Sequence, residues 1–595
     1  MSKPAKNLYT TLREAESKFA ARDYEGAIAA YARAIDIDPS QLVFWENIGK
    51  CYLAARKQEH AILVFHKLAS ENPGNGNYVA QLAGALRFYM VSVANSTIKA
   101  AIALCLKTHN VQHEWLYKSW YSYLGVAPEY EPLRRLLCAP EETFSPIFFV
   151  LPPDYLNDSF LVDGIANCAC ALPEQETFFK SLRAHFMTMY DGGAQSLTPY
   201  RPLLGALASQ VFATEYVFAA MPEEEERLAR LEQTIATQMP PDHDALLLLA
   251  CYRPLERLRG NPSFVEWARM RAETNDAFGR LLAEQVVTYM TEEALREEIP
   301  SFGRIANDVS QKVRAQYEEN PYPRWRNAST ARIYPFPADL SALQKPGKKL
   351  DILIAGCGTG RQVSNVMQYT FEADTLAIDL SRSSLSYALR KARELGYADR
   401  VSFAQMDILD VRTLDRSFDI VMSTGVLHHM QDPMAGWQAL VDVARPGAVL
   451  QIALYSDIAR RHIAQARDVI RREHIPASPE GIRAFRESLR NGAGADDDTA
   501  HLIGAGDFYT MSNCRDLLFH VQEHRFTIPQ IHDALEKLGL EFEKFDFATP
   551  RIFDAYDRMF PGDPSRRSLD NWHAFEIANP DTFIGMYQMI LRKLS

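Results

Sequence analysis

The chain is 595 residues long, which is too much for one hydrophobic core and indicates roughly three or four compact units. Apolar residues make up 47% and charged residues 23% of the chain, a composition that is typical of folded globular proteins and excludes general disorder. The formal net charge of -11 excludes an overall positive field that would attract nucleic acid or anionic lipid.

The eight cysteines suggest neither a disulfide framework nor a zinc site, because only Cys168 and Cys170 lie close together in the sequence. The first residues lead into a charged helical pattern, and no stretch reaches the about 18 uninterrupted apolar residues of a membrane span. We therefore expect a cytoplasmic protein with no metal, no membrane association and no nucleic-acid partner.

Residues 1–108 contain a repeat with the 34-residue period of tetratricopeptide helices. Three residues recur after 34 positions, since Ala27, Tyr31 and Pro39 are followed by Ala61, Phe65 and Pro73. The second copy also has two large residues and a small one at the spacing that paired helices need, namely Trp45, Gly49 and Tyr52. Such helices bind a protein or peptide in their groove, or they serve as a structural cap on the next domain.

The rest of the chain divides into three further regions by pattern. Residues 109–300 have apolar residues at helical spacing between proline turns and predict a helical middle domain. Residues 301–349 are interpreted as a linker with an aromatic lid segment. Residues 350–595 alternate short β-branched runs with helices, which predicts an α/β domain of seven strands with cap insertions at about 458–513 and 550–580.

The predicted strands place the motifs that follow. The first five are Asp351–Ala355, Thr375–Asp379, Val401–Phe403, Phe418–Ser423 and Ala448–Tyr455. A turn at Arg445-Pro446-Gly447 is expected to lead into the fifth strand. A helix over Thr527–Leu538, ended by Gly539, is followed by strands at Glu541–Phe547 and Thr582–Arg592. The fold class is thus α plus α/β, with helices first and a Rossmann-like sheet last.

A glycine loop follows the first predicted strand and has the sequence Gly356-Cys357-Gly358-Thr359-Gly360. Without β-carbons, such a turn lets a ligand approach the backbone closely. Asp379 ends the second strand, where a carboxylate can accept both ribose hydroxyls, and Asp407 follows the third, where it can accept from an adenine amino group. This order indicates an adenosyl ligand at the carboxyl edge of the sheet.

The glycine loop could bind either a nicotinamide cofactor or S-adenosylmethionine. Nicotinamide cofactors favour Gly-x-Gly-x-x-Gly, and the large Arg361 stands where close helix packing wants glycine or alanine. S-adenosylmethionine is therefore the favoured ligand. A sheet whose glycines bind no ligand is the remaining alternative.

From about 350 to 456 these motifs resemble, in order, those of class I S-adenosylmethionine-dependent methyltransferases. The resemblance includes the segment Val426-Leu427-His428-His429-Met430-Gln431-Asp432-Pro433. It departs at Ile354, where the family usually has an acid, so the methionine ammonium is expected to bind backbone carbonyls instead. The cofactor-binding residues that the resemblance implies are Ala355, Gly356, Cys357, Gly358, Gly360, Asp379, Leu380, Met406, Asp407, Ile408 and Thr424.

The whole layout also resembles bacterial proteins that join tetratricopeptide repeats to a methyltransferase domain. A segment similar to one in that group spans residues 316–325 and has the sequence Gln-Tyr-Glu-Glu-Asn-Pro-Tyr-Pro-Arg-Trp. Its prolines stiffen an extended stretch that presents Tyr317, Tyr322, Arg324 and Trp325. We expect a lid over cofactor or substrate, with an aromatic brace between domains as the alternative.

Candidate residues for the acceptor side come from two places. His428 and His429 follow the fourth strand, where either could remove a proton from an acceptor or simply shape the pocket. His520, Glu523 and His524 match a short inverted zinc-protease motif if they share one helix face. We expect a substrate-pocket role or a structural ion network for them, and no metal.

The predicted activity is methyl transfer from S-adenosylmethionine to a protein or peptide recruited by the repeats, an association made at the level of the fold. The alternative acceptor is a small metabolite, which gains from the resemblance of the strand-four segment to small-molecule methyltransferases. A different class of protein, a repeat scaffold with a non-catalytic methyltransferase-like domain, gains from Ile354.

Overall fold

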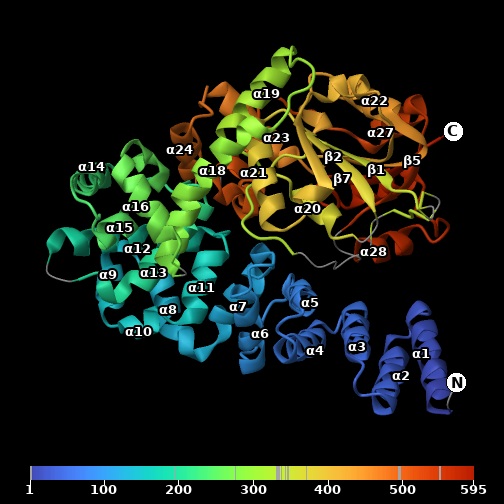
Figure 1. The fold of residues 1–595 in the computed structure, drawn as a ribbon, viewed down its shortest axis with the longest axis horizontal. Coiled ribbons are helices and arrows are strands. Elements are labelled where there is room, and N and C mark those ends of the chain that lie inside the picture. Colours follow the sequence, from blue (N-terminus) through green and yellow to red (C-terminus); the bar gives the residue numbers. More distant parts are fainter. Residues whose placement is uncertain are drawn as a thin grey trace. The chain divides into compact units, whose positions relative to one another are not determined.

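The computed structural model describes residues 3–193, 196–274, 276–329, 336, 338–341, 343–344, 347–369, 372–492, 497–547 and 551–594. The chain divides into two compact units (Figure 1). One comprises residues 1–214, 220–282 and 326–334, and the other comprises residues 215–219, 283–325 and 335–595. Among the described residues no helix is both long enough and apolar enough to cross a membrane.

The first unit begins with helices that repeat in length and position. They are α1 (Lys3–Ala20), α2 (Tyr24–Ile37), α3 (Leu42–Ala54), α4 (Gln58–Glu71), α5 (Gly76–Leu86) and α6 (Ser96–Leu106). Both α4 and α5 start 34 residues after the helix two before them. Gly49 is required by the packing, because a β-carbon there would lie 2.5 Å from the Phe65 ring. The close approach that the sequence predicted at this glycine is confirmed.

The remainder of the first unit is helical in the residues described, as the spacing of its apolar residues predicted. Its helices are α7 (Tyr117–Val126), α8 (Glu131–Leu137), α9 (Glu141–Phe149), α10 (Pro153–Leu156), α11 (Ser159–Asn167), α12 (Pro173–Gly192), α13 (Arg201–Ala213), α14 (Pro222–Thr237), α15 (His243–Ala250), α16 (Pro262–Ala272) and α17 (Ala277–Leu282).

The second unit is built on a sheet of seven strands among its described residues, in the order β3-β2-β1-β4-β5-β7-β6. The strands are β1 (Leu350–Ala355), β2 (Ala373–Asp379), β3 (Val401–Gln405), β4 (Phe418–Thr424), β5 (Ala444–Leu454), β6 (Leu540–Phe545) and β7 (Tyr587–Lys593). The first five pair in parallel, and β7 runs antiparallel to both β5 and β6. The predicted seven-stranded sheet is thus confirmed.

Each face of the sheet has its own core, because successive side chains of a strand point to opposite faces. Leu353 and Ala355 of β1 pack in one core with α22 (Pro433–Val443) and α27 (Ile528–Leu538). Ile352 and Ile354 pack in the other core with α20 (Arg361–Met367) and α21 (Arg382–Glu394). Figure 1 shows these helix pairs on the two sides of the sheet.

Most strand boundaries lie within one or two residues of the prediction, and the starts of β5 and β7 differ by more. Residues 445–447, expected to form a turn, belong to β5, because Ala444 already pairs with Phe418 and the register shifts before Val449. The last strand begins at Tyr587 and not at Thr582, because residues 580–585 form turns and bends. The helix ended by Gly539 is confirmed, with Thr527 as its capping residue.

Helices beside the sheet supply the rest of the second unit. The predicted insertion after β5 contains α23 (Arg461–Arg472), α24 (Pro479–Arg490) and α25 (Asp497–Gly504), and α26 (Met511–Phe519) follows it. The second insertion contains α28 (Arg551–Met559) and α29 (Leu569–Ala578), while residue 550 lies outside the described residues. Before the sheet come α18 (Thr288–Leu295) and α19 (Asp308–Glu319), the latter within the predicted linker.

Candidate functional site

The glycine loop joins β1 to α20 with three glycines at positive φ: +74° at Gly356, +52° at Gly358 and +82° at Gly360. The loop is also tightly surrounded. A β-carbon at Gly356 would lie 2.4 Å from Val426, and one at Gly358 would lie 2.5 Å from the carbonyl oxygen of Tyr322. Both the positive φ angles and the lack of room for a β-carbon therefore require glycine here.

Asp379, at the end of β2, lies against this loop. One carboxylate oxygen accepts a hydrogen bond from the Gly358 amide at 2.8 Å, and the other accepts one from the Ser381 amide at 2.9 Å. Burial raises the pKa of Asp379 to about 6 despite these bonds. A carboxylate has about four acceptor sites, so Asp379 keeps capacity for further donors.

The other residues proposed for the cofactor lie along the same edge. Asp407 follows β3, is buried and accepts a hydrogen bond from the Leu409 amide at 3.0 Å. Its neighbours Met406 and Ile408 are buried, and Leu380 is half-buried. Thr424, at the end of β4, accepts a hydrogen bond from the Gln362 side chain at 3.0 Å.

Three residues in or just before the glycine loop have side chains buried in the interior. Ala355 is fully buried in the sheet core. Cys357 is buried, which raises the pKa of its thiol and keeps it protonated. Ile354 packs in the core with α20 and α21, so the position where the family usually has an acid points into that core.

The aromatic segment before the sheet packs directly on the glycine loop. The carbonyl of Tyr322 accepts a hydrogen bond from the Thr359 amide at 3.3 Å, and the Trp325 indole donates to the Thr359 carbonyl at 3.2 Å. Trp325 is buried, with the cations of Arg361 and Lys391 over its ring. Arg324 points elsewhere and pairs with Glu215 at 3.3 Å. The segment is thus placed as a cover over the loop.

Tyr317 connects this segment to the helical insertion. Its hydroxyl donates to the Asp516 carboxylate at 2.7 Å and lies 3.1 Å from Nε2 of His520. Nδ1 of His520 accepts the Gln522 amide at 3.1 Å, so in the neutral ring Nε2 carries the hydrogen and donates to Tyr317. A chain of donors therefore runs from His520 through Tyr317 to Asp516.

The two histidines after β4 lie beside that chain. His428 is fully buried, stacks on Tyr455 at 3.7 Å and has no hydrogen-bond partner on either ring nitrogen. Burial lowers its pKa well below the ordinary value, so the ring is neutral. His429 stacks on His520 at 3.6 Å, and its Nδ1 lies 2.7 Å from the Gln522 carbonyl. Burial lowers the pKa of His429 to about 4.

The supposed helix behind the inverted zinc-protease motif is wrong. Helix α26 ends at Phe519, and His520 already has extended backbone with φ -58° and ψ 137°. The side chain of Glu523 is 1% exposed and binds Arg460 at 2.8 Å, while Nε2 of His524 lies 2.9 Å from the side-chain Nε2 of Gln522. With this extended backbone Glu523 pairs with the buried Arg460.

One group of described residues could still bring three metal-ligand atoms together, namely His429, Asp516 and His520, within 4.8 Å of one another. A metal on Nε2 of His520 requires that nitrogen to be free of hydrogen. The Gln522 amide on Nδ1 places the hydrogen on Nε2 instead. The hydrogen-bond pattern therefore favours a relay over a metal centre.

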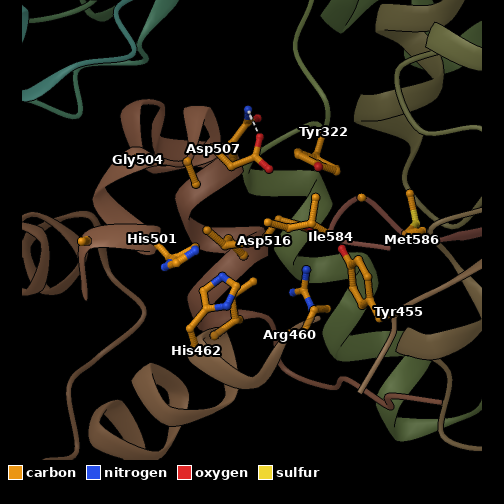
Figure 2. Close-up of a pocket in the computed structure, with 16 residues that line it drawn as sticks. Tyr322, Tyr455, Arg460, His462, His501, Gly504, Asp507, Asp516, Ile584 and Met586 are labelled. Atoms are coloured by element: carbon orange, nitrogen blue, oxygen red, sulfur yellow. Dashed lines mark hydrogen bonds between the residues drawn. The ribbon is translucent and has the colours of Figure 1, made fainter. Parts of the chain in front are cut away.

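A cavity of about 590 Å³ opens beside these residues (Figure 2). Its lining comes from the aromatic segment (Tyr322), the end of β5 (Tyr455), the insertion and the loop before β7 (Ile584 to Met586). The sulfur of Met586 lies 3.8 Å from where a β-carbon of Gly425 would be, just after β4. The cavity is thus linked to the glycine loop through Tyr322, whose carbonyl binds the Thr359 amide, and Met586 brings its wall close to the end of β4.

The polar residues of the cavity were missed by sequence reasoning. They include Asp507, Asp516 and Arg460, which lie on elements of the insertion or next to it. A weak signal was present for Asp516, which precedes His520 by four residues in a cluster of ionisable groups. Of the predicted substrate or lid residues, Tyr322 lines the cavity, whereas Tyr317 and His520 contact it through Asp516.

The residues at the carboxyl edge of the sheet fit S-adenosylmethionine. The glycine loop leaves no room for side chains, and two carboxylates follow β2 and β3, where they can accept hydrogen bonds from hydroxyl and amino groups. Backbone carbonyls near Gly356 and Thr424 stay the predicted acceptors for the ammonium group.

Residues 353–452 match a protein family described as a methyltransferase domain. This match confirms S-adenosylmethionine as the cofactor. It covers the segment from β1 to β5, which holds the glycine loop and both acids.

Related proteins share parts of the chain. An uncharacterised protein from Synechococcus sp. is 27% identical over 318 residues, covering 48% of this chain and 73% of that one. Norajmaline N-methyltransferase from Rauvolfia serpentina is 32% identical over 127 residues, which is 21% of this chain and 40% of the plant enzyme. A solved magnesium protoporphyrin IX methyltransferase from Synechocystis with bound SAM is 14% identical, with a TM-score of 0.26 over 49% of this chain and 100% of that one.

Proposed function

Because residues 353–452 form a methyltransferase domain that uses S-adenosylmethionine, we propose that this chain methylates a small molecule bound in the cavity beside the glycine loop. The observation that carries the proposal is the cavity itself, whose volume of about 590 Å³ is in the range of small-molecule sites. Its walls come from the same unit as the sheet. Norajmaline N-methyltransferase, a relative over 127 residues, acts on a small molecule by name.

The cofactor, when bound, supplies an activated methyl group, and its transfer requires alignment of the acceptor above all. Tyr322 contributes to both sites, since its carbonyl binds the glycine loop and its side chain lines the cavity. The aromatic segment therefore acts as a lid that excludes water from the junction of the two sites. Asp379 and Asp407 hold the nucleoside, and the cavity residues orient the acceptor.

Purified protein is incubated with methyl-labelled S-adenosylmethionine and a size-fractionated lysate. Label is expected in the small-molecule fraction and is expected to disappear with Asp379→Ala. Label confined to macromolecules would overturn the small-molecule proposal. Failure of wild-type protein to bind the cofactor in calorimetry would favour a non-catalytic scaffold instead.

A second candidate acceptor is a protein or peptide recruited by the N-terminal helices. The helices α2 to α5 support it, because their start positions repeat after 34 residues as in tetratricopeptide proteins that join repeats to a methyltransferase domain. Deleting residues 1–108 would then reduce labelling of macromolecules while leaving the affinity for S-adenosylmethionine unchanged. Unaltered labelling after deletion would remove the support for recruitment.

A further inference from the structure

Two carboxylates dominate the charge of the cavity. Asp516 is 3% exposed and lines the inner wall, where the Tyr317 hydroxyl fixes one of its oxygens. Asp507 lines the same cavity with an exposed side chain, and the Asn513 amide donates to it at 3.1 Å. Figure 2 shows both acids with Tyr322 on the cavity wall.

The arginine of the cavity, Arg460, makes its ion pair with Glu523 and not with these two acids. Arg460 makes two hydrogen bonds to Glu523, at 2.8 and 3.3 Å, and both side chains are almost fully buried. The guanidinium also lies 3.5 Å from the centre of the Tyr455 ring. Its charge and its planar donors are thus engaged by groups of the protein. No lysine lines the cavity among the described residues.

Aromatic and histidine side chains complete the site. The ring of Tyr455 is covered by Arg460 and His428, so it presents its hydroxyl end to the cavity. Tyr322 stacks on Tyr317 at 6.2 Å, and its ring forms part of the cavity wall. The Tyr322 ring next to the two carboxylates provides the aromatic surface that an organic ammonium ion prefers.

We propose that the acceptor is a basic amine, held as its ammonium form by Asp507 and Asp516, and that Asp516 takes the proton from its nitrogen before methyl transfer. The inference rests on the proposed function. The nitrogen lone pair then forms the new C–N bond as the C–S bond of the methyl donor breaks and its electron pair returns to sulfur. The proton leaves Asp516 for solvent. Tyr317 and His520 are positioning residues, since they act through Asp516.

The groups around Asp516 decide how it titrates. Burial raises its pKa to about 7, while the hydrogen bond from Tyr317 and the charge of Arg460 lower it. A base of this pKa is half ionised near neutral pH and suits proton transfer there. The charged or titratable groups around it are Tyr317, Tyr322, His429, Tyr455, Arg460, Arg467, Asp507, His520 and Glu523.

The first experiment classifies the labelled products from the small-molecule fraction on a cation exchanger at acidic pH. Retention of the label is expected, because a methylated amine stays basic. Labelled products that are all neutral or anionic would overturn the inference and leave the proposed function intact. Absence of label from every small molecule would contradict the proposed function, and the inference would fall with it.

The second experiment measures binding of phenethylamine and of the neutral 2-phenylethanol by calorimetry in the presence of S-adenosylhomocysteine. Wild-type protein is expected to bind the amine about tenfold more tightly, as a charge-assisted hydrogen bond implies. Asp516→Asn should reduce this preference, with Asp507 as the remaining carboxylate, but keep the acceptor oxygen for Tyr317. Asp457→Asn is the matched control, since Asp457 is an acid outside the cavity lining that pairs with Arg525. Equal binding of both probes to wild type would overturn the inference.

Discussion

The hydroxyl of Tyr317 donates to the carboxylate of Asp516 at 2.7 Å, although the two residues are 199 positions apart in the sequence. The bond joins the aromatic segment before β1 to helix α26, which lies between β5 and β6 in the sequence. Because Tyr322 of the same segment contacts the glycine loop, the cofactor side and the acceptor side share one structural element. Changes in this segment are therefore expected to affect both sites.

Removal of the Tyr317 hydroxyl tests the positioning of Asp516. The hydrogen bond from Tyr317 lowers the pKa of Asp516, which burial holds at about 7, so Tyr317→Phe is expected to raise that pKa. A base works in its ionised form, and kcat/KM should therefore rise with pH at a higher midpoint in the variant than in wild type. The measurement is kcat/KM as a function of pH, with the acceptor that the labelling experiment identifies as substrate.

Tyr130→Phe serves as the control for this experiment. It removes a similar phenol-to-carboxylate bond, from Tyr130 to Asp158 at 2.8 Å, in the other unit. Its pH profile should equal that of wild type. An unchanged midpoint in Tyr317→Phe would show that Asp516 is not the titrating base.

The raised pKa of Asp379 leads us to expect that cofactor binding depends on pH. Its pKa without ligand is raised to about 6 by burial, and the ionised form is the better acceptor for ribose hydroxyls. Affinity for S-adenosylmethionine should therefore fall as pH falls through 6, by about tenfold one unit below that pKa. Calorimetry across this range checks the slope. Asp379→Asn should bind more weakly and without this step, and a step that persists in the variant would assign it to another group.

Gly358→Ala tests the contact between the glycine loop and the aromatic segment. The new β-carbon would lie 2.5 Å from the Tyr322 carbonyl oxygen, so the segment must move away from the loop. We expect a loss of affinity for S-adenosylmethionine of at least about tenfold, or about 1.4 kcal/mol, measured by calorimetry. The left-handed backbone adds a stability loss of roughly 1–2 kcal/mol.

Gly396→Ala is the matched control for the glycine loop. Gly396 has φ +75°, but no atom lies within 4 Å of the position of its β-carbon. It should show a similar loss of stability in denaturant unfolding and unchanged cofactor affinity. If both variants bind the cofactor like wild type, the contact with Tyr322 does not matter for binding.

The sequence predicted the sheet and the cofactor edge well because both depend on local signals. Gly356 and Gly358 are required by positive φ and close packing at one turn, and Asp379 ends a strand whose β-branched residues mark it. The helix before β6 was found from the glycine that ends it, Gly539. Such signals lie within a few residues of the feature that they predict.

The acceptor side could not be predicted in the same way. Asp507, Asp516 and Tyr322 come from segments far apart in the sequence, and only the folded insertion brings them to one cavity. The prediction of a helix over residues 520–524 was wrong, because α26 ends at Phe519 and Glu523 forms a buried ion pair. The partner of Glu523 is Arg460, which is distant in the sequence, so the local spacing of the histidines could not indicate this ion pair.

That ion pair gives the last prediction. Arg460 and Glu523 have side chains that are 4% and 1% exposed, so Glu523→Ala leaves a buried arginine without its main partner. Breaking a buried pair from one side typically costs about 3–5 kcal/mol. Asp457→Ala breaks the Arg525 pair, whose side chains are 33% and 51% exposed, and should cost less than about 1 kcal/mol. Denaturant unfolding of both variants compares the two values, and similar losses would mean that Arg460 finds another partner when Glu523 is absent.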